Sequence, residues 1–180
     1  MLAVFGLGNP PSYNGTRHNI GKEAALSLKG KMPLAFKSAF ADIYVRGGKA
    51  LIIGKTYMNE SGLVFRDALR KLKISPEDIL VICDDFNMDL GKLRYRVSGS
   101  SGGHNGIESV IEKSGTVDFP RLRLGIGPPV MNFSGTSDWV LENFEKNEKD
   151  KAEALALAAA DFVKSRWGRF WPEENGSFNV

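Results

Sequence analysis

The two histidines of the chain are the residues best able to move protons, and each stands directly before an asparagine. His18-Asn19 and His104-Asn105 both lie in polar segments that contain glycine. Histidine is the side chain whose ordinary pKa allows proton exchange near neutrality. A lone histidine is more often a hydrogen-bonded structural residue, but two with similar flanks point to parts of one site.

Polar clusters follow four apolar runs at the points where those runs end. In an α/β sheet, ligands bind outside the carboxyl ends of the strands, so strands that run alike would bring these clusters together. A histidine could then take a proton from water, a carboxylate could orient the imidazole, and amides could hold an oxyanion. Taken singly, each asparagine is more often a turn or cap residue. The clusters are Asn9, Tyr57-Met58-Asn59, Asp84-Asp85 and the segment 99–105.

The elements that must position these clusters can be read from the spacing of apolar residues. Short apolar runs alternate with segments of helical periodicity, which predicts an α/β fold. Gly47-Gly48 separates two strand-like runs and predicts a hairpin, so the sheet should be mixed. The expected strands are 2–5, 42–46, 50–54, 79–83, 93–97 and 121–126, and the expected helices are 20–28, 64–72, 106–113 and 152–163.

Composition indicates an ordinary globular protein. Its 180 residues fit one domain, 1–180, with 42% apolar and 25% charged residues. No apolar run reaches the length that crosses a bilayer, and the opening residues fit a buried strand better than a signal peptide. A single cysteine, Cys83, excludes an internal disulfide and a zinc cluster and favours a reducing cytoplasm. The net charge of +3 permits an anionic partner such as RNA without requiring one.

Two glycine motifs have competing interpretations. Gly6-x-Gly8 resembles the start of a dinucleotide fingerprint, but its third glycine would fall at Pro11. The run 99–103 fits the Gly-x-Ser-x-Gly elbow of serine hydrolases, which would make Ser101 a nucleophile. Elbow enzymes place their histidine late in the chain, and no histidine follows position 104. A serine hydrolase is therefore the lesser alternative.

A metal site formed by His18, His104 and Asp84 is a third interpretation. Metal motifs usually place ligands close together in the chain, whereas these histidines lie on separate glycine loops. We therefore expect no metal and no other cofactor. Cys83 lies inside an apolar run and is expected to be an inert buried thiol.

Taken together, the clusters resemble the bacterial-type peptidyl-tRNA hydrolase family. They occur in the family's order from residue 2 to about residue 127, and such a series is far more specific than any one motif. The matching segments are Gly6-Leu7-Gly8-Asn9-Pro10, Tyr13 with Thr16-Arg17-His18-Asn19 and Gly21, Lys55-Thr56-Tyr57-Met58-Asn59 with Ser61-Gly62, Asp84-Asp85, Gly102-Gly103-His104-Asn105-Gly106 and Arg121-Leu122-Arg123-Leu124-Gly125-Ile126-Gly127.

The resemblance implies a single domain with a twisted mixed β-sheet flanked by α-helices. It implies hydrolysis of the ester that joins a peptide to the terminal ribose of tRNA, which recycles tRNA during translation. His18 would be the general base acting on water, Asp84 would orient it, and His104 would shape its loop. The residues expected to bind substrate are Asn9, Tyr13, Tyr57, Asn59 and Asn105.

The resemblance also places basic residues beside the cleft to hold tRNA phosphate. Family members often carry lysine at the first two of these positions, where this chain has arginine. The chain departs from the pattern again at Pro11, where glycine is usual, and at Asn87 and Asp89, where a second acid and a nearby proline are usual. The three expected phosphate ligands are Arg94, Arg96 and Arg123.

The expected partner is peptidyl-tRNA, bound through the acceptor end of the tRNA and the attached peptide. We expect a cytoplasmic monomer that does not associate with membranes, and a lid formed by the loop 128–136. The main alternative is a non-catalytic RNA-binding member of the family, of the kind that serves in organellar splicing. The lack of an Arg- and Ser-rich leader argues against an organelle. The lesser alternative is a serine esterase that uses Ser101.

Overall fold

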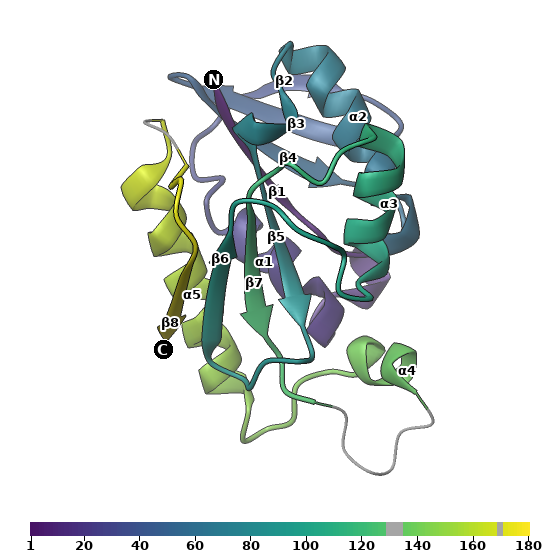
Figure 1. Ribbon diagram of the computed structural model, residues 1–180, viewed down its shortest axis with the longest axis vertical. Helices are drawn as coiled ribbons and strands as arrows, with labels where there is room; N and C mark the ends of the chain where they lie inside the picture. The colour runs from purple at the N-terminus through teal and green to yellow at the C-terminus, as the bar shows by residue number, and fades with distance from the viewer. Residues whose placement is uncertain (129–134, 169–170) are drawn as a thin grey trace.

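A mixed β-sheet forms the centre of the molecule, with helices packed on both faces (Figure 1). The computed structural model describes residues 1–128, 135–168 and 171–180. Across the sheet the strands follow the order β2-β3-β4-β1-β5-β7-β6-β8. They are β1 (Leu2–Gly6), β2 (Leu34–Lys37), β3 (Ala41–Arg46), β4 (Lys49–Gly54), β5 (Ile79–Asp85), β6 (Lys92–Arg96), β7 (Arg121–Gly125) and β8 (Gly176–Asn179).

Helices and short 3-10 turns connect these strands. The α-helices of the described residues are α1 (Ile20–Leu26), α2 (Ser61–Leu72), α3 (Asn105–Ser114), α4 (Thr136–Leu141) and α5 (Lys149–Arg166). The 3-10 turns are η1 (Pro11–Tyr13), η2 (Arg17–Asn19), η3 (Met58–Glu60) and η4 (Pro76–Asp78).

The four central strands run in the same direction. β1 pairs in parallel with β4 and with β5, and β5 pairs in parallel with β7. Every residue of β5 is buried, as expected for a parallel strand covered on both faces. The carboxyl ends of these strands therefore meet at one edge of the sheet, where ligands bind in α/β proteins.

Side chains of the central strands point alternately to the two faces of the sheet and belong to two separate hydrophobic cores. Leu80 and Ile82 of β5 join the core beneath α1 and α5. Ile79, Val81 and Cys83 join the core beneath α2 and α3. The two helical layers thus hold the sheet from both sides, as Figure 1 shows, and fix its carboxyl edge.

The glycine pair at 47–48 forms the predicted hairpin between β3 and β4. Both glycines have positive φ, 55° and 77°, as a two-residue turn with the twist of the flanking strands requires. β2 and β3 thus run antiparallel to their neighbours at one side of the sheet, and β6 and β8 do so at the other.

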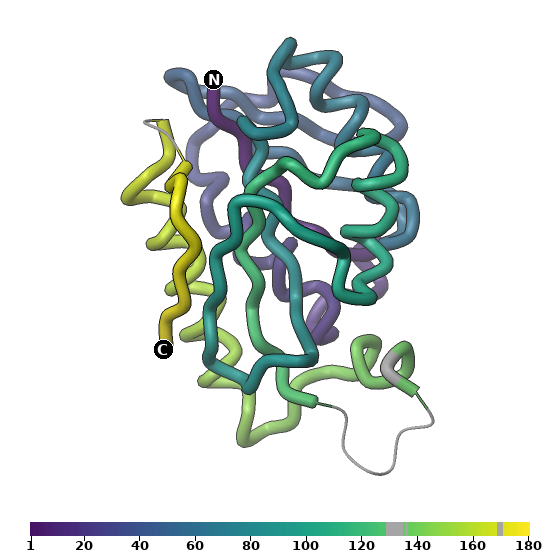
Figure 2. The backbone as a smooth tube through the Cα atoms, viewed as in Figure 1, coloured from purple at the N-terminus to yellow at the C-terminus, as the bar shows by residue number. Residues whose placement is uncertain are grey.

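The direction of β6 affects how the glycine loop reaches the site. Because β6 is antiparallel to β7, it ends at the opposite edge from the carboxyl ends of the central strands. The segment 97–104 therefore returns across the face of the sheet before α3 begins (Figure 2). Arg121 anchors this return, since its Nη1 atom donates to the carbonyl of Gly99 at 2.6 Å.

The predicted α/β class, with a mixed sheet flanked by helices, is confirmed. Each expected strand and helix is present with small shifts of its ends, whereas β2, β8 and α4 were not expected. Positions 129–134 of the predicted lid lie outside the described residues. Among the residues described, no helix has both the length and the apolar character needed to cross a membrane.

Candidate active site

Asp84 lies at the carboxyl end of β5 and joins the two histidines. Its Oδ1 atom lies 2.8 Å from His18 Nδ1 and 2.9 Å from His104 Nε2. All three side chains are buried, and Asp84 is only 1% exposed. The structure thus brings His18 and Asp84 into contact and adds His104 to the same carboxylate oxygen.

His104 carries its proton on the nitrogen that faces Asp84. Its Nδ1 atom accepts hydrogen bonds from the backbone N–H groups of Gly106 and Ile107 at 3.1 and 3.3 Å, which caps α3. The accepting nitrogen of a neutral imidazole carries no hydrogen, so this network assigns the hydrogen to Nε2. Both ring nitrogens are therefore engaged, and His104 holds the carboxylate and the start of α3 in place.

The second ring nitrogen of His18 has no hydrogen-bond partner among residues 1–128, 135–168 and 171–180. When Nδ1 donates to Asp84, the lone pair lies on Nε2, on the other side of the ring. The His18 side chain lines both a cleft, described below, and a smaller hollow beside it. An imidazole oriented by a carboxylate, with a lone pair available at a cleft, can act as a general base toward water.

The backbone on both sides of His18 is held by close packing. Arg17 is 1% exposed, and its guanidinium forms a bidentate pair with Glu148, the N-cap residue of α5, at 3.2 and 2.6 Å. On the other side, a Cβ at Gly21 would overlap the carbonyl oxygen of Ile82. Glycine therefore lets α1 lie directly against β5, which brings His18 to the strand that carries Asp84.

The pKa of Asp84 reflects two opposing influences. Burial raises the pKa, because a charged carboxylate is less stable away from water. Electrostatic attraction and hydrogen bonds from His104 and His18 lower the pKa and prevail, so the pKa of Asp84 lies well below its ordinary value. Asp84 is therefore ionised near neutrality and can stabilise a positive charge that forms on His18.

The same three side chains meet a simple criterion for a metal site. Their donor atoms lie within 4.8 Å of one another, so the sequence argument from separate loops does not hold in three dimensions. Ligand atoms around a tetrahedral ion with bonds of about 2.1 Å lie roughly 3.4 Å apart. The histidine nitrogens lie 2.8 and 2.9 Å from Asp84 Oδ1, which fits shared hydrogens and not a metal between them.

A cleft of about 460 Å³ opens beside His18. Tyr13 and Tyr57 stand edge to face in its wall, with ring centroids 6.3 Å apart. Val140 and Leu141 of α4 add apolar surface. A hollow of about 100 Å³ adjoins this cleft and reaches Asp84 and His104. All the residues that the sequence predicted for substrate contact line the main cleft: Asn9, Tyr13, Tyr57, Asn59 and Asn105.

The positions that depart from the family pattern are accommodated locally. Pro11 begins η1, where a missing N–H leaves no bond unmade, and η1 ends at Tyr13 in the cleft wall. Asn87 donates its N–H to Asp85 Oδ1 at 2.9 Å, and Asp89 pairs with Lys92 at 2.6 Å. β5 extends to Asp85 beside these positions.

Hydrogen bonds fix the orientation of Asn9. Its N–H donates to Asn19 Oδ1 at 2.7 Å, and its carbonyl accepts from Lys22 Nζ at 2.8 Å. Its side-chain Oδ1 accepts the N–H of Met58 at 2.9 Å. The NH₂ end of the Asn9 carboxamide is therefore the end available to donate into the cleft.

The three predicted phosphate ligands lie on adjacent strands but differ in their surroundings. Arg94 on β6 stands opposite Arg123 on β7. Arg123 is 8% exposed and bonds Asp85 at 3.3 Å and two carbonyls of the glycine loop at 3.2 and 3.0 Å. Arg94 is half-buried, and its Nε has no hydrogen-bond partner among the described residues. Arg123 thus anchors the loop, whereas Arg94 is better placed to bind an anion.

The contacts of Ser101 do not favour a serine nucleophile. Its Oγ accepts the N–H of Gly103 at 3.3 Å. His104, three residues later, has both ring nitrogens engaged and cannot take a proton from this hydroxyl. The elbow motif instead forms part of the loop that Arg123 holds.

Sequence reasoning missed three contributors to the site. Lys22 supports the carbonyl of Asn9, and no local pattern marks a lysine for that contact. Arg17 belongs to the matched motif, which was the available signal, but its partner Glu148 is distant in the chain. Helix α4 adds Val140 to the cleft, and its position depends on packing that the sequence does not reveal.

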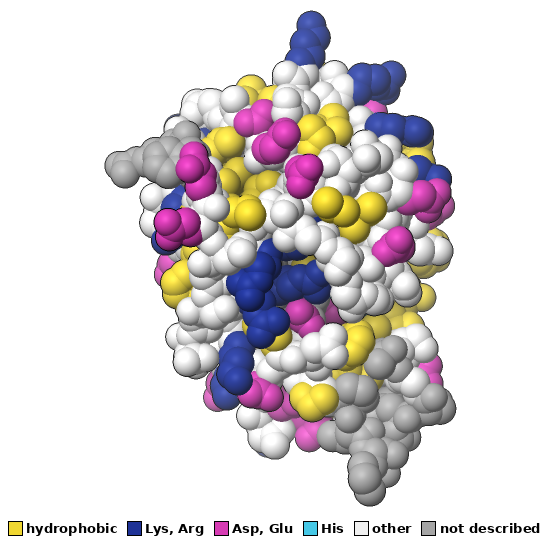
Figure 3. All heavy atoms as spheres, viewed as in Figure 1, with side chains coloured by type: hydrophobic (Ala, Val, Ile, Leu, Met, Phe, Trp, Pro, Cys, Tyr) yellow, Lys and Arg dark blue, Asp and Glu magenta, His cyan; other side chains and the backbone are white. Residues whose placement is uncertain are grey.

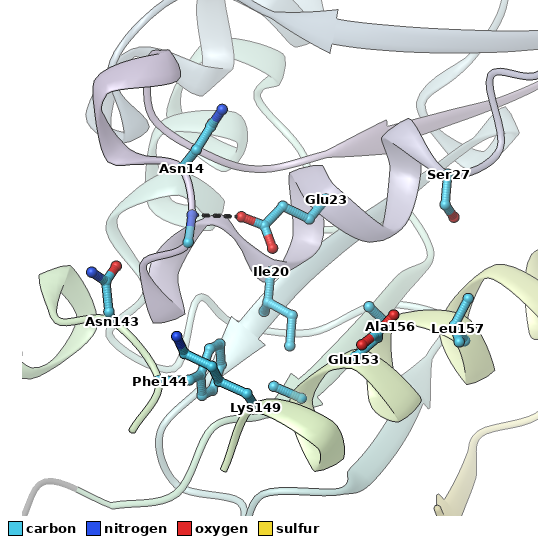
Figure 4. Close-up of a pocket in the computed structure, with 12 residues that line it drawn as sticks. Asn14, Ile20, Glu23, Ser27, Asn143, Phe144, Lys149, Glu153, Ala156 and Leu157 are labelled. Carbon is cyan, nitrogen blue, oxygen red and sulfur yellow. Dashed lines mark hydrogen bonds between the residues drawn. The ribbon is translucent and has the colours of Figure 1, made fainter. Parts of the chain in front are cut away.

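A second large hollow, of about 490 Å³, lies between α1 and α5 (Figure 4). It shares no lining residue with the cleft at His18. Ile20 and Phe144 point into it, and Glu23 accepts the N–H of Gly15 at 2.7 Å at its rim. This bond fixes the loop before His18 to α1. The hollow therefore lies beside residues that hold His18 in place, and it is not part of the active site.

Comparison with known proteins gives a consistent result. The chain matches the family model for peptidyl-tRNA hydrolase over residues 3–174. It is 46% identical over 165 residues to the peptidyl-tRNA hydrolase of Methylacidiphilum infernorum, covering 89% of this chain and 88% of that protein. It is 39% identical over 171 residues to the one from Clostridium botulinum, covering 91% and 88%.

Solved structures agree with the sequence relatives. The crystal structure of peptidyl-tRNA hydrolase from Acinetobacter baumannii matches with a TM-score of 0.81 and 30% identity, covering 91% of this chain and 87% of that one. A complex of peptidyl-tRNA hydrolase with N-propanol matches with a TM-score of 0.80 and 31% identity, at the same coverage.

Proposed function

Because the chain belongs to the peptidyl-tRNA hydrolase family, we propose that it hydrolyses the ester between a peptide and the terminal ribose of tRNA, with His18 as general base. The observation that carries this assignment is the bond from His18 to buried Asp84 at the edge of a cleft lined by carboxamides. The products are a peptide with a free carboxyl group and a tRNA with a free ribose hydroxyl.

The His18–Asp84 pair supplies the base for the first step. Nε2 of His18 removes a proton from a water molecule as its oxygen attacks the ester carbonyl, and the carbonyl becomes a tetrahedral oxyanion. Asp84 stabilises the imidazolium that forms. When the intermediate collapses, the carbon–oxygen bond to the ribose breaks and the imidazolium returns its proton to the ribose oxygen.

The carboxamides supply donors for the charge that develops on the carbonyl oxygen. Asn9 has its NH₂ group available because its Oδ1 is bound to Met58. A donor held in place before the reaction stabilises an oxyanion more than one that must reorient, and removing one such donor typically costs about 100-fold to 1000-fold in rate. We assign this role to Asn9.

The other side chains of the cleft fit a peptide better than a free amino acid. Asn59 and Asn105 line the cleft and can donate to the carbonyl of the peptide bond that blocks the α-amino group. An unblocked ester has an ammonium group at that place, which offers no acceptor and is costly to desolvate. Tyr13 and Tyr57 give apolar surface for the peptide side chains.

Arg94, Arg96 and Arg123 are proposed to hold tRNA phosphate. Figure 3 shows Lys and Arg side chains gathered over β6 and β7, on the face seen in Figure 1. Arginine is suited to phosphate because its planar fork donates two hydrogen bonds at once. Arg94 is expected to contribute most, since Arg123 is already bonded to Asp85 and the glycine loop.

We further propose that the protein acts as a monomer in the cytoplasm. The only cysteine, Cys83, is buried and unpaired, which suits a reducing compartment. Light scattering at the concentration used for the assays should give the mass of a single chain. A dimer mass would overturn the monomer proposal and leave the catalytic assignment unaffected.

The function is tested with two substrates that differ only at the α-amino group. The protein should cleave N-acetyl-aminoacyl-tRNA and leave the unblocked aminoacyl-tRNA intact. Ser101→Ala should retain most activity, because its hydroxyl faces the loop backbone. No cleavage of the blocked ester would favour a non-catalytic RNA-binding role, which the named relatives do not favour.

A further inference from the structure

The strand β8 lies beyond the residues 3–174 that match the family model. It pairs antiparallel with β6, the strand that carries Arg94 and Arg96. The family match therefore does not describe its contribution, which is made at the surface proposed to bind tRNA.

The side chains of β8 alternate between two faces of the sheet. Leu93 of β6 joins the core beneath α5, and its partner in the register is Phe178. The ring of Phe178 lies 5.9 Å from that of Phe162 on α5. Because neighbouring residues of a strand point to opposite faces, Ser177 and Asn179 face away from α5.

The face to which Ser177 and Asn179 point is not covered by α2 and α3, although the segment 97–104 crosses it at β7, where Arg123 is 8% exposed. No described residue of β6, β7 or β8 joins the core beneath α2 and α3. Figure 3 shows the Lys and Arg side chains gathered on this open face. Both Ser177 and Asn179 are exposed.

Polar side chains form rows across these three strands. Arg123 on β7 stands opposite Arg94 on β6, and Arg94 stands opposite Ser177 on β8. The next row on β6 and β8 joins Lys92 to Asn179. Neighbouring strands lie about 4.8 Å apart, so a phosphate bound to Arg94 is within reach of the Ser177 hydroxyl.

We propose that β8 extends the tRNA-binding surface, with Ser177 and Asn179 donating hydrogen bonds to backbone phosphates beside Arg94. β8 also positions Arg96, because Nη1 of Arg96 lies 3.5 Å from the carbonyl of Gly176. A cationic side chain flanked by neutral donors complements a polyanion. The inference rests on the proposed function for the identity of the nucleic acid, but not on the catalytic assignment.

The test changes the charge at Ser177 in both directions. Affinity for deacylated tRNA is measured at low salt for Ser177→Asp and Ser177→Lys, and KM is measured with N-acetyl-aminoacyl-tRNA. Ser75→Asp is the matched control, because Ser75 caps η4 before the other end of β5 and aspartate is accepted at such a position. Unchanged melting temperatures establish that the variants fold.

Ser177→Asp should weaken tRNA binding on the order of fivefold, and Ser177→Lys should strengthen it by a similar factor, as expected for one added charge near a phosphate. Ser75→Asp should bind like the parent protein. Both effects should vanish near 1 M salt, where the Debye length is about 3 Å. Cleavage of an N-acetyl-aminoacyl ester of adenosine, which has no backbone phosphate, should be unchanged.

Shifts of the same sign for both Ser177 variants, or no shift in either, would overturn the role of β8. That result would leave the hydrolase function in place if the parent protein still cleaves its substrate. Conversely, failure of the parent protein to cleave would reject the proposed function, while the paired binding shifts would still decide the role of β8.

Discussion

Replacing Asp84 by asparagine separates the charge of this residue from its geometry. Both histidines bond the same oxygen of Asp84, at 2.8 and 2.9 Å. The Oδ1 atom of an asparagine can accept both bonds, so His18 can keep its orientation and its tautomer. The Asp84→Asn variant therefore removes the negative charge while leaving the hydrogen bonds available.

The size of the effect follows from the contact between His18 and Asp84. The carboxylate and the imidazolium that forms during the reaction have charge centres about 4 Å apart, and at an effective dielectric of about 20 they attract by about 4 kcal/mol. Each 1.36 kcal/mol or so corresponds to a tenfold change in rate. The cleavage step should therefore slow by about 1000-fold, while tRNA affinity should hold, because Arg94 is unchanged.

The assay is single-turnover cleavage of N-acetyl-aminoacyl-tRNA at neutral pH, with tRNA affinity measured in parallel. Asp161→Asn, an exposed aspartate on α5, is the matched control and should react like the parent protein. A loss below tenfold in folded Asp84→Asn would refute the reasoning, because the carboxylate charge would then contribute little to the transition state.

Three other predictions concern the supports of the site. Although burial raises the pKa of Asp84, the imidazoles lower it overall, so this group stabilises the fold above about pH 4 and loses that effect as pH falls further. In Asp84→Asn the free energy of unfolding should therefore depend less steeply on pH in the acid range. The difference corresponds to up to one proton fewer taken up on unfolding. Lys22→Met removes the Nζ donor from the buried carbonyl of Asn9, which costs about 1 kcal/mol and should lower the melting temperature by about 2–4 °C. The same change should slow cleavage about tenfold, because Asn9 loses its bond to Nζ. Glu148→Gln should destabilise the fold by about 2 kcal/mol, because Arg17 is left buried without its charged partner.

Each of these predictions has an outcome that contradicts it. If the unfolding free energy of Asp84→Asn depended on acid pH as steeply as that of the parent protein, the pKa of Asp84 would not differ between the folded and unfolded states. A higher melting temperature or an unchanged rate in Lys22→Met would show that the bond from Nζ to Asn9 does not support the site. Glu148→Gln should be compared with Glu153→Gln, an exposed change on the helix that Glu148 precedes, and equal stability of the two variants would remove the argument for Arg17.

The position of Asp84 could be predicted because its cause is local. An uninterrupted apolar run identifies β5 as a central strand, and the polar residue that ends it must lie at the carboxyl edge. The same logic places Asn9 after β1 and Asn59 after β4. β1 pairs in parallel with β5, and β4 pairs in parallel with β1, so all three strands end at the same edge. Only the residue types at strand ends were needed.

The position of His104 could not be derived in this way. Strands that all run alike would bring this loop to the carboxyl edge directly, yet β6 is antiparallel to β7. His104 reaches the site because Arg121 and Arg123 hold the returning loop by its carbonyls, and these contacts join residues about twenty positions apart. The tautomer of His104 likewise depends on its capping of α3.

The edge strands were missed for a different reason. All four residues of β2 are exposed, so no alternation of apolar and polar side chains marks the strand. β8 contains Gly176 and Asn179, residue types that are depleted in strands. Its pairing with β6 is a tertiary contact that the local sequence does not signal.

The most direct test of the central claim is the single-turnover rate of His18→Ala on N-acetyl-aminoacyl-tRNA, with tRNA affinity measured on the same protein. Loss of the base should slow cleavage at least 100-fold or so while the affinity stays within a factor of about two. Cleavage at a rate near that of the parent protein would contradict the account, because another group would then have to activate the water.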